Sequence, residues 1–392
     1  MLPLTGVTVV TLEHAVAAPF ATRQLADLGA RVIKIERPGT GDFARQYDEA
    51  VNGQSSYFVW LNRSKESVAV DVKSPEGRRI LHKLAARADV LVQNLGPGAA
   101  DRLGLGAQAV RARDPAKIVL SITGWGSSGP WAKRKAYDLL VQCETGLVSL
   151  TGSAAEPARV GISVADIAAG MYGFSGVLAA LYERRVTGLG ASLEVSLFEA
   201  LAEWMGQPAN YTAGSGRQPP RSGAQHATIA PYGPFTARGG HAILIAIQNE
   251  AEWARFCTGF LANPDVASDL RFATNTLRVA NRAVLDKLIA ERFGELDAAS
   301  ATALLDQAGI AHAEVNTVSE FLQHPVLRER RRWRPVQTPA GIVEALLPPI
   351  DLGRGAPRMD PVPDIGEHTV GVLAELGYSS AEITGLGDRG VI

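Results

Sequence analysis

The first third of the chain alternates short runs of β-branched residues with segments of helical periodicity, and this alternation limits the fold more than any other feature. The runs occupy residues 6–12, 31–36, 67–71, 89–94 and 117–123. Helices are expected between them near 19–29, from Pro75 after Ser74 as N-cap, and near 106–113. The pattern predicts an α/β fold with a Rossmann-like, doubly wound parallel sheet, whose ligands bind beyond the carboxyl ends of the strands.

The chain of 392 residues is too long for one ordinary core, so at least two domains are expected. Residues 1–210 are assigned to the large Rossmann-like domain. Residues 212–226 are dense in Gly, Pro, Ser and Arg, which is typical of a linker or a binding loop. We expect 211–330 to contain this linker and a smaller α/β domain, and 331–392 to return to the large domain.

The composition disfavours several classes of protein. A formal net charge of -1 offers no broad cationic surface for nucleic acid or an anionic membrane. Cys143 and Cys257 lack the spacing of a disulfide framework or a zinc site, so no metal is expected. We find no basic leader and no apolar run of about 18 residues. These observations predict a cytoplasmic protein that binds neither nucleic acid nor membrane.

Asp166 lies directly before an apolar stripe with helical spacing, which comprises Ile167, Met171, Phe174, Val177, Leu178 and Leu181. Aspartate is a preferred N-cap residue, so Asp166 is predicted to cap this helix. A helix N-terminus also favours an ionised carboxylate, which is the form that a nucleophile must take. The two roles are compatible, and both stay open at this point.

Signals for a nucleotide cofactor are weak. The stretches 39–45 (GTGDFAR) and 104–106 (GLG) contain glycines, but the turn after the first predicted strand, EHAVAAPFA, has none, which disfavours a nicotinamide dehydrogenase. Four basic residues at strand–helix junctions are either solvated charges or contacts to a phosphorylated cofactor: Arg37, Lys73, Arg102 and Lys135. These patterns alone indicate a Rossmann-like enzyme without stating its chemistry.

Six stretches, in the same order along the chain, resemble the class III CoA-transferases, the family that includes formyl-CoA transferase, carnitine CoA-transferase and the α-methylacyl-CoA racemases. They are residues 6–42, 62–77 and 88–106, the KAYD motif at 135–138, the helix beginning at Asp166, and residues 368–383. The resemblance implies a CoA-binding Rossmann-like domain and an intertwined homodimer.

The resemblance also implies roles for single residues. Asp166 would be the catalytic nucleophile. Tyr137 and Asp138 would position or polarise the reacting groups at the same site. The implied CoA contacts are His14, Ala15, Val16, Ala17, Arg37, Val70, Lys73, Asn94, Leu95, Arg102, Leu103 and Lys135. Formyl-CoA transferase has a glutamine where this chain has Val16, so backbone N–H groups would have to contact an oxyanion here. Its glycine-rich loop has no clear counterpart, the closest material being residues 221–233.

Residues 135–146 and 226–235 look most like the subgroup that moves CoA from succinyl-CoA to short dicarboxylates such as citramalate, itaconate or mesaconate, through aspartyl anhydride and aspartyl-CoA thioester intermediates. A second carboxylate needs a cation or a cluster of donors, and the candidates are Arg45, Arg221 and His226. Arg221 is equally an exposed linker charge. Two alternatives stay open: an acyl-CoA racemase of the same fold, and a catalytically silent CoA-binding protein.

Overall fold

The computed structural model describes residues 1–353 and 355–392. Contacts between Cα atoms divide them into two compact units. The first unit contains Met1–Thr145, Val160–Gly206 and Val326–Ile392, and the second contains Gly146–Arg159 and Gln207–Pro325. The sequence-based domain boundaries after residues 210 and 330 stay predictions, and the sequence analysis did not anticipate that residues 146–159 group with the second unit.

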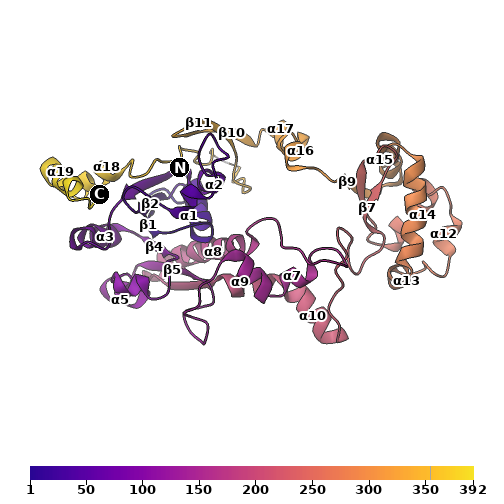
Figure 1. Cartoon of the computed structure of the whole chain (residues 1–392), viewed down its shortest axis with the longest axis horizontal. Helices are drawn as coiled ribbons and strands as arrows, with labels where there is room; N and C mark the ends of the chain where they lie inside the picture. Colours follow the sequence, from indigo (N-terminus) through magenta and orange to yellow (C-terminus); the bar gives the residue numbers. More distant parts are fainter. Residues whose placement is uncertain (354) are drawn as a thin grey trace. The chain divides into compact units, whose positions relative to one another are not determined.

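The first unit is built on a sheet of six parallel strands in the order β3-β2-β1-β4-β5-β6 (Figure 1). The strands are β1 Thr8–Leu12, β2 Arg31–Glu36, β3 Lys65–Ala69, β4 Val90–Gln93, β5 Ile118–Thr123 and β6 Ser192–Ser196. The predicted doubly wound α/β sheet is confirmed. The strand order reverses between β1 and β4, and such a switch point is where open α/β sheets bind ligands.

Helices connect these strands. They are α1 Ala17–Asp27, α2 Ser56–Asn62, α3 Pro75–Arg87, α4 Ala99–Arg102, α5 Ala107–Arg113, α6 Asp138–Glu144, α8 Val164–Thr187 and α9 Leu197–Trp204, with a short 3₁₀ helix η1 at Phe43–Gln46. The predicted start of α3 is confirmed, because Ser74 Oγ accepts the backbone N–H of Gly77 at 3.0 Å and Pro75 is the first helical residue.

Residues 326–392 also belong to the first unit. They form α17 Pro325–Glu329, the antiparallel hairpin of β10 Trp333–Thr338 and β11 Gly341–Leu346, and the helices α18 Thr369–Glu375 and α19 Ser380–Asp388. Val372 and Leu373 of α18 share one hydrophobic core with Val10 of β1 and Leu81 of α3. Figure 1 shows α18 and α19 beside α3.

The second unit has a three-stranded antiparallel sheet of β7 Tyr232–Thr236, β8 Ala242–Ala246 and β9 Ala311–Glu314. Its helices are α7 Leu147–Leu150, α10 Gly206–Ser215, α11 Glu250–Arg255, α12 Asp265–Ser268, α13 Asn275–Ala280, α14 Arg282–Glu295, α15 Ala298–Ala308 and α16 Val318–Leu322, with a π-helical turn η2 at Phe256–Phe260. Its separate core contains Ile243, Phe260 and Phe293.

Helix α8 is long and apolar enough to cross a membrane by length and composition, with a mean hydropathy of 1.5 in its most apolar window. This differs from the sequence analysis, which found no such stretch. A core helix of a soluble protein passes the same test, and α8 packs against α1 and the sheet. Even so, only 44% of that window is buried. An apolar part of its surface is therefore left uncovered by this chain.

Candidate active site

The N-terminus of α8 carries Asp166, and a second aspartate caps it. Asp166 is the third residue of the helix, after the N-cap position at Ser163. Asp138 Oδ1, at the start of α6, accepts the backbone N–H of Ala165 at 2.7 Å and that of Asp166 at 3.2 Å. The prediction that Asp166 itself is the N-cap is therefore wrong, because Asp138 satisfies N–H groups that an N-cap residue would otherwise satisfy.

Gln142 fixes the orientation of Asp138. The fully buried Gln142 donates from Nε2 to Asp138 Oδ2 at 2.7 Å, and its Oε1 accepts the backbone N–H of Val160 at 3.0 Å. This side chain thus ties α6 to the segment that leads into α8. The sequence analysis missed Gln142, although its i, i+4 spacing from Asp138 on a helix was a usable signal.

The Asp166 carboxyl is poised between its acid and carboxylate forms. The side chain keeps some exposure to solvent while protein atoms crowd its carboxyl group. Burial, and in second place the negative charge of Asp138, raise the pKa of Asp166 from 3.8 to about 7. The α8 dipole acts in the opposite sense. Near neutral pH the residue can therefore change between a protonated acid and a nucleophilic carboxylate.

A glycine in α8 brings Asp166 close to the start of α1. Gly170 lies one turn after Asp166, and a Cβ placed on it would stand 2.7 Å from the carbonyl oxygen of Ala17 and 3.0 Å from Phe20 Cδ1. The two helices can approach this closely only because this residue has no side chain. The predicted nucleophile is thereby placed one helical turn from the contact with the first turn of α1.

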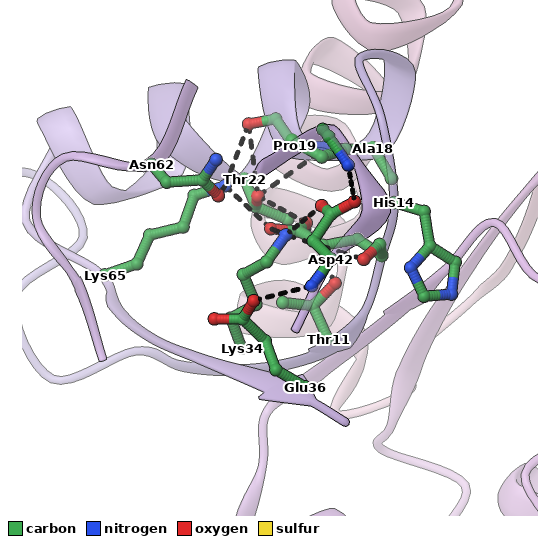
Figure 2. Close-up of polar contacts among 12 residues, drawn as sticks. Thr11, His14, Ala18, Pro19, Thr22, Lys34, Glu36, Asp42, Asn62 and Lys65 are labelled. Atoms are coloured by element: carbon green, nitrogen blue, oxygen red, sulfur yellow. Dashed lines mark hydrogen bonds and ion pairs between the residues drawn. The ribbon is translucent and has the colours of Figure 1, made fainter. Parts of the chain in front are cut away.

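The turn between β1 and α1 lies at the switch point of the sheet. The side-chain amide of Asn94, directly after β4, accepts the N–H of His14 and donates to its carbonyl oxygen, both at 2.9 Å. The His14 ring stacks on Phe43 at 5.4 Å between centroids, and in Figure 2 it points away from the neighbouring charged cluster. Burial lowers the pKa of His14, which favours a neutral imidazole.

The predicted CoA contacts follow the strands of the large sheet, in segments that leave its carboxyl edge. The exposed ones are Arg37, Lys73, Arg102 and Lys135. The buried ones are Val16, Ala17 and Val70, and the partly buried ones are His14, Ala15, Asn94, Leu95 and Leu103. Parallel strands bring these segments to one edge of the sheet, although the residues are far apart in the sequence.

A cavity of about 490 Å³ opens beside two of these positions. Pro38 and Gly39, which follow Arg37, and Ala69, which precedes Val70, contribute to its wall. The rest of the wall comes from Asp364, Ile365, Gly366, Thr369, Val370 and Ile392. The sequence analysis did not predict that residues 364–392 contribute here, because nothing local in them signals contact with the loop after β2.

The structure gives Arg45 a partner that the sequence analysis did not foresee. Its guanidinium donates to both carboxylate oxygens of Glu36, at 2.9 and 2.8 Å, and stands 3.6 Å above the ring of Phe58. Arg45 lowers the pKa of Glu36 to about 2 against the opposing effect of burial. A guanidinium held in this way is a poor receptor for a substrate carboxylate, and its substrate role stays a prediction.

Arg221 and His226 belong to the second unit. Arg221 donates to the backbone carbonyls of Ser153 at 2.9 Å and Ala154 at 3.1 Å. His226 stacks on Tyr232 at 5.2 Å, and its Nδ1 accepts the backbone N–H of Thr228 at 3.2 Å. Both predicted receptors therefore have local partners, and their role in binding substrate is likewise untested.

Tyr47 is a residue near Asp166 that the sequence analysis missed. Burial raises its pKa to about 12, and the charge of Asp166 adds to this effect. Tyr47 packs on Phe43 at 5.7 Å and edge-on against Tyr57 at 5.4 Å. Tyr137, which precedes α6, is 63% exposed and also acts on the pKa of Tyr47. Nothing in the sequence around an aromatic loop residue indicates that it lies near the nucleophile.

The sequence profile described as CoA-transferase family III matches residues 4–369. The chain belongs to CoA-transferase family III. The resemblance noted from the six stretches is thus confirmed, and the protein is an enzyme of the CoA-transferase class. The succinyl-CoA:glutarate CoA-transferase of Mus musculus is 35% identical over 398 residues, which cover 100% of this chain and 91% of that protein.

Two further comparisons agree with this family III assignment. The succinyl-CoA--D-citramalate CoA-transferase of Chloroflexus aurantiacus is 27% identical over 384 residues, covering 95% of this chain and 94% of that protein. A crystal structure of a CAIB/BAIF family protein from Brucella suis superposes with a TM-score of 0.84 at 34% identity, covering 96% of this chain and 99% of that one.

Proposed function

We propose that this family III CoA-transferase moves CoA from succinyl-CoA to a short dicarboxylic acid, with Asp166 as the covalent carrier. The observation that carries the proposal is the arrangement at the start of α8, where Asp138 caps the helix and Asp166 keeps a carboxyl group of raised pKa. The similar mouse and Chloroflexus proteins are named for succinyl-CoA with glutarate or citramalate. Glutarate is the first acceptor to test, followed by citramalate, itaconate and mesaconate.

The proposed reaction needs four acyl transfers. The Asp166 carboxylate attacks the thioester carbonyl of succinyl-CoA and the C–S bond breaks. CoA thiolate is released, and Asp166 and the succinyl group form a mixed anhydride. The thiolate then attacks the aspartyl carbonyl, which releases succinate and forms an aspartyl-CoA thioester. The acceptor carboxylate attacks that carbonyl, and the released thiolate attacks the acceptor's acyl carbon in the new anhydride. Product acyl-CoA leaves and Asp166 is regenerated, so no net energy source is required.

We propose that CoA lies along the carboxyl edge of the large sheet. The exposed Arg37, Lys73, Arg102 and Lys135 would meet its phosphates, because cationic side chains bind phosphate oxygens through charge-assisted hydrogen bonds. The cavity beside Arg37 and Val70 has room for part of the nucleotide end. Asp138 would act by positioning the nucleophile rather than by touching the reacting atoms.

The decisive experiment compares the wild-type protein with Asp166→Asn. We expect wild-type protein to transfer CoA from succinyl-CoA to glutarate and to yield a peptide containing Asp166 with CoA attached, detected by mass spectrometry after rapid quenching. Asp166→Asn should form neither product nor adduct while it still binds CoA. Transfer by Asp166→Asn at more than a small fraction of the wild-type rate would exclude the covalent role.

Dicarboxylate selectivity is tested separately. Glutarate and butyrate, offered as acceptors at equal concentration, should differ strongly in kcat/KM if a cation or donor reads the second carboxylate. Equal activity would remove the dicarboxylate part of the proposal and leave the transferase part intact. Alanine variants of Arg221 and His226 then show whether either residue supplies the selectivity.

The racemase alternative predicts a different result. Racemisation needs an acid and a base on opposite faces of the α-carbon, and family racemases resemble this chain but carry a histidine where Tyr137 stands. Tyrosine exchanges protons much less readily than histidine near neutral pH. We therefore expect no deuterium at the α-position of a 2-methylacyl-CoA in D₂O. Incorporation at a rate comparable to transfer would favour the racemase, and the absence of both reactions would favour a silent CoA-binding protein.

We also propose that the enzyme is a cytoplasmic homodimer. The uncovered side of α8 supports the dimer, because Met171, Tyr182 and Val186 lie on one side of the helix and are exposed, and Leu189 just beyond the helix end is exposed as well. A second copy of the chain is the occupant that the family resemblance favours. Light scattering should report a dimer, and Tyr182→Glu with Val186→Glu should weaken it. A wild-type monomer at micromolar concentration would contradict the proposal.

A further inference from the structure

The turn from β1 into α1 contains a strained residue. Ala15 has a φ of 60°, in the left-handed region that residues with a Cβ avoid. Such a conformation costs free energy and persists only where the surrounding structure fixes it. The fixing contact here is with Asp42, whose Oδ1 accepts the N–H of Ala15 at 3.2 Å and that of Ala44 at 2.9 Å.

The other oxygen of Asp42 anchors it to the core. Lys34 donates from Nζ to Asp42 Oδ2 at 2.8 Å, and both residues are buried. The same ammonium group lies 3.5 Å from the backbone carbonyl oxygen of Glu13 and 3.5 Å from its Oε1. Asp42 and Lys34 therefore connect both ends of the turn, Glu13 and Ala15, to the middle of β2.

Glu13 is held from its other side as well. Lys65 donates to Glu13 Oε1 at 2.7 Å, and Thr22 donates to Oε2 at 2.6 Å. Burial alone would raise the pKa of Glu13, but the two lysines lower it to about 2, so the group is ionised at neutral pH. This cluster contains two cations and two anions. Loss of any one charge would leave another buried without compensation.

The turn leads to backbone N–H groups that no side chain caps. Val16 occupies the N-cap position of α1 and makes no side-chain cap hydrogen bond. The N–H groups of the first turn therefore point outward at the positive end of the helix dipole. The carbonyl of Ala17, in that same turn, is the group that Gly170 of the Asp166 helix approaches.

We propose that Asp42 is a positioning residue for the transfer reaction, which holds the strained turn at Ala15 so that the first N–H groups of α1 meet the thioester oxygen beside Asp166. The inference rests on the proposed function. It explains why a chain with Val16, rather than a side-chain amide donor, needs a rigid backbone at this place. Donors aimed at a developing oxyanion contribute to rate only when their position is fixed in advance.

The test uses two isosteric substitutions of buried, paired aspartates. Asp42→Asn removes the charge that Lys34 holds. Asp27→Asn is the matched control, because Asp27 is equally buried and pairs with Arg63 through two hydrogen bonds of 2.9 and 2.8 Å, at the opposite end of α1. Both variants should lower the melting temperature. We expect Asp42→Asn to reduce kcat at saturating succinyl-CoA at least tenfold, and Asp27→Asn to stay within about twofold of wild type.

A rescue experiment separates conformation from charge. Glycine adopts positive φ without strain, so Ala15→Gly added to Asp42→Asn should restore kcat several-fold, whereas Ala15→Gly added to Asp27→Asn should give no such gain. Equal losses of kcat in Asp42→Asn and Asp27→Asn, or no rescue by Ala15→Gly, would overturn the inference.

Misfolding of Asp42→Asn and failure of the proposed function can each be distinguished from failure of the positioning role. If Asp42→Asn does not fold, Ala15→Val strains the same turn while every buried charge stays in place, and an unchanged kcat in that variant would overturn the inference. If wild-type protein transfers CoA to none of the acceptors, the proposed function has failed. Normal wild-type transfer with an unimpaired Asp42→Asn means that only the positioning role has failed.

Discussion

Asp138 Oδ1 accepts the backbone N–H of Asp166 at 3.2 Å, so one acidic residue caps the helix turn that carries the other. The two aspartates therefore divide two tasks between them. Asp138 stabilises the helix end, and its negative charge helps to keep a proton on Asp166. Chemistry at Asp166 and stability at α8 can for this reason be separated by substitution.

The raised pKa of Asp166 makes the stability of the protein depend on pH. The folded state favours the protonated acid, so wild-type Asp166 contributes stability below its unfolded pKa of 3.8 and loses it as pH rises through about 7. Asp166→Asn removes this dependence. We expect the variant to melt at a higher temperature than wild type at pH 8, with the difference shrinking towards pH 5. An identical difference at both pH values would contradict the assignment.

Asp138→Asn should move the pH profile of the reaction. Removal of the negative charge lowers the pKa of Asp166, so the acidic limb of kcat/KM should shift to lower pH than in wild type. The weaker cap should cost about 1 kcal/mol of stability. Gln142→Ala, which keeps the charge of Asp138 but frees its side chain, should lower kcat without the same shift. If the acidic limb of the kcat/KM profile does not shift in Asp138→Asn, the charge of Asp138 does not control the pKa of Asp166.

Gly170→Ala should reduce both stability and turnover. The added methyl meets the carbonyl oxygen of Ala17 at 2.7 Å, and overpacking of this kind costs about 1–3 kcal/mol. The control is Gly176→Ala in the same helix, where the added methyl meets only Leu193 at an ordinary 3.6 Å and alanine is the better helix former. Thermal unfolding should show a lower melting temperature for Gly170→Ala but not for Gly176→Ala. Equal effects at the two sites would mean that helix propensity, not the close approach, decides.

Val370→Trp tests the nucleotide end of the proposed CoA site. Val370 lines the cavity beside Arg37 and is 62% exposed, so a larger side chain can reduce the cavity without disturbing the core. We expect KM for succinyl-CoA to rise several-fold and kcat to change little, because the thioester end is untouched. Val318→Trp, at a 77% exposed position of the second unit, is the control. An unchanged KM in Val370→Trp would move the nucleotide elsewhere.

Local patterns predicted the elements that are locally encoded. The β-branched runs gave β1 to β5, and Ser74 with Pro75 gave the start of α3, because strand pattern and capping act over a few residues. Strand β6 escaped prediction, since SLEVS has two serines and a glutamate among five residues and forms a strand at the edge of the sheet. Its pairing with β5 is a tertiary effect.

The candidate site was only partly readable for the same reason. Asp166 was found from its place before an apolar stripe and from the family resemblance, but its capping partner lies 28 residues earlier in the chain. Arg45 was nominated as a substrate receptor because a free guanidinium suits a carboxylate. Its pairing with Glu36 depends on how the loop after β2 folds back. Local sequence patterns do not show which segments a loop brings into contact when it folds back.

Residues 364–392 complete the wall of the cavity beside β2 and β3, and this affects how the chain folds during translation. Asp71, just past β3, donates its N–H to the carbonyl oxygen of Val391, and the helices α18 and α19 cover apolar residues that β2, β3 and α3 expose early. During translation this patch has no cover until residues 364–392 have emerged from the ribosome. A nascent chain should therefore depend on chaperones that shield apolar surface until residues 364–392 can pack against this patch.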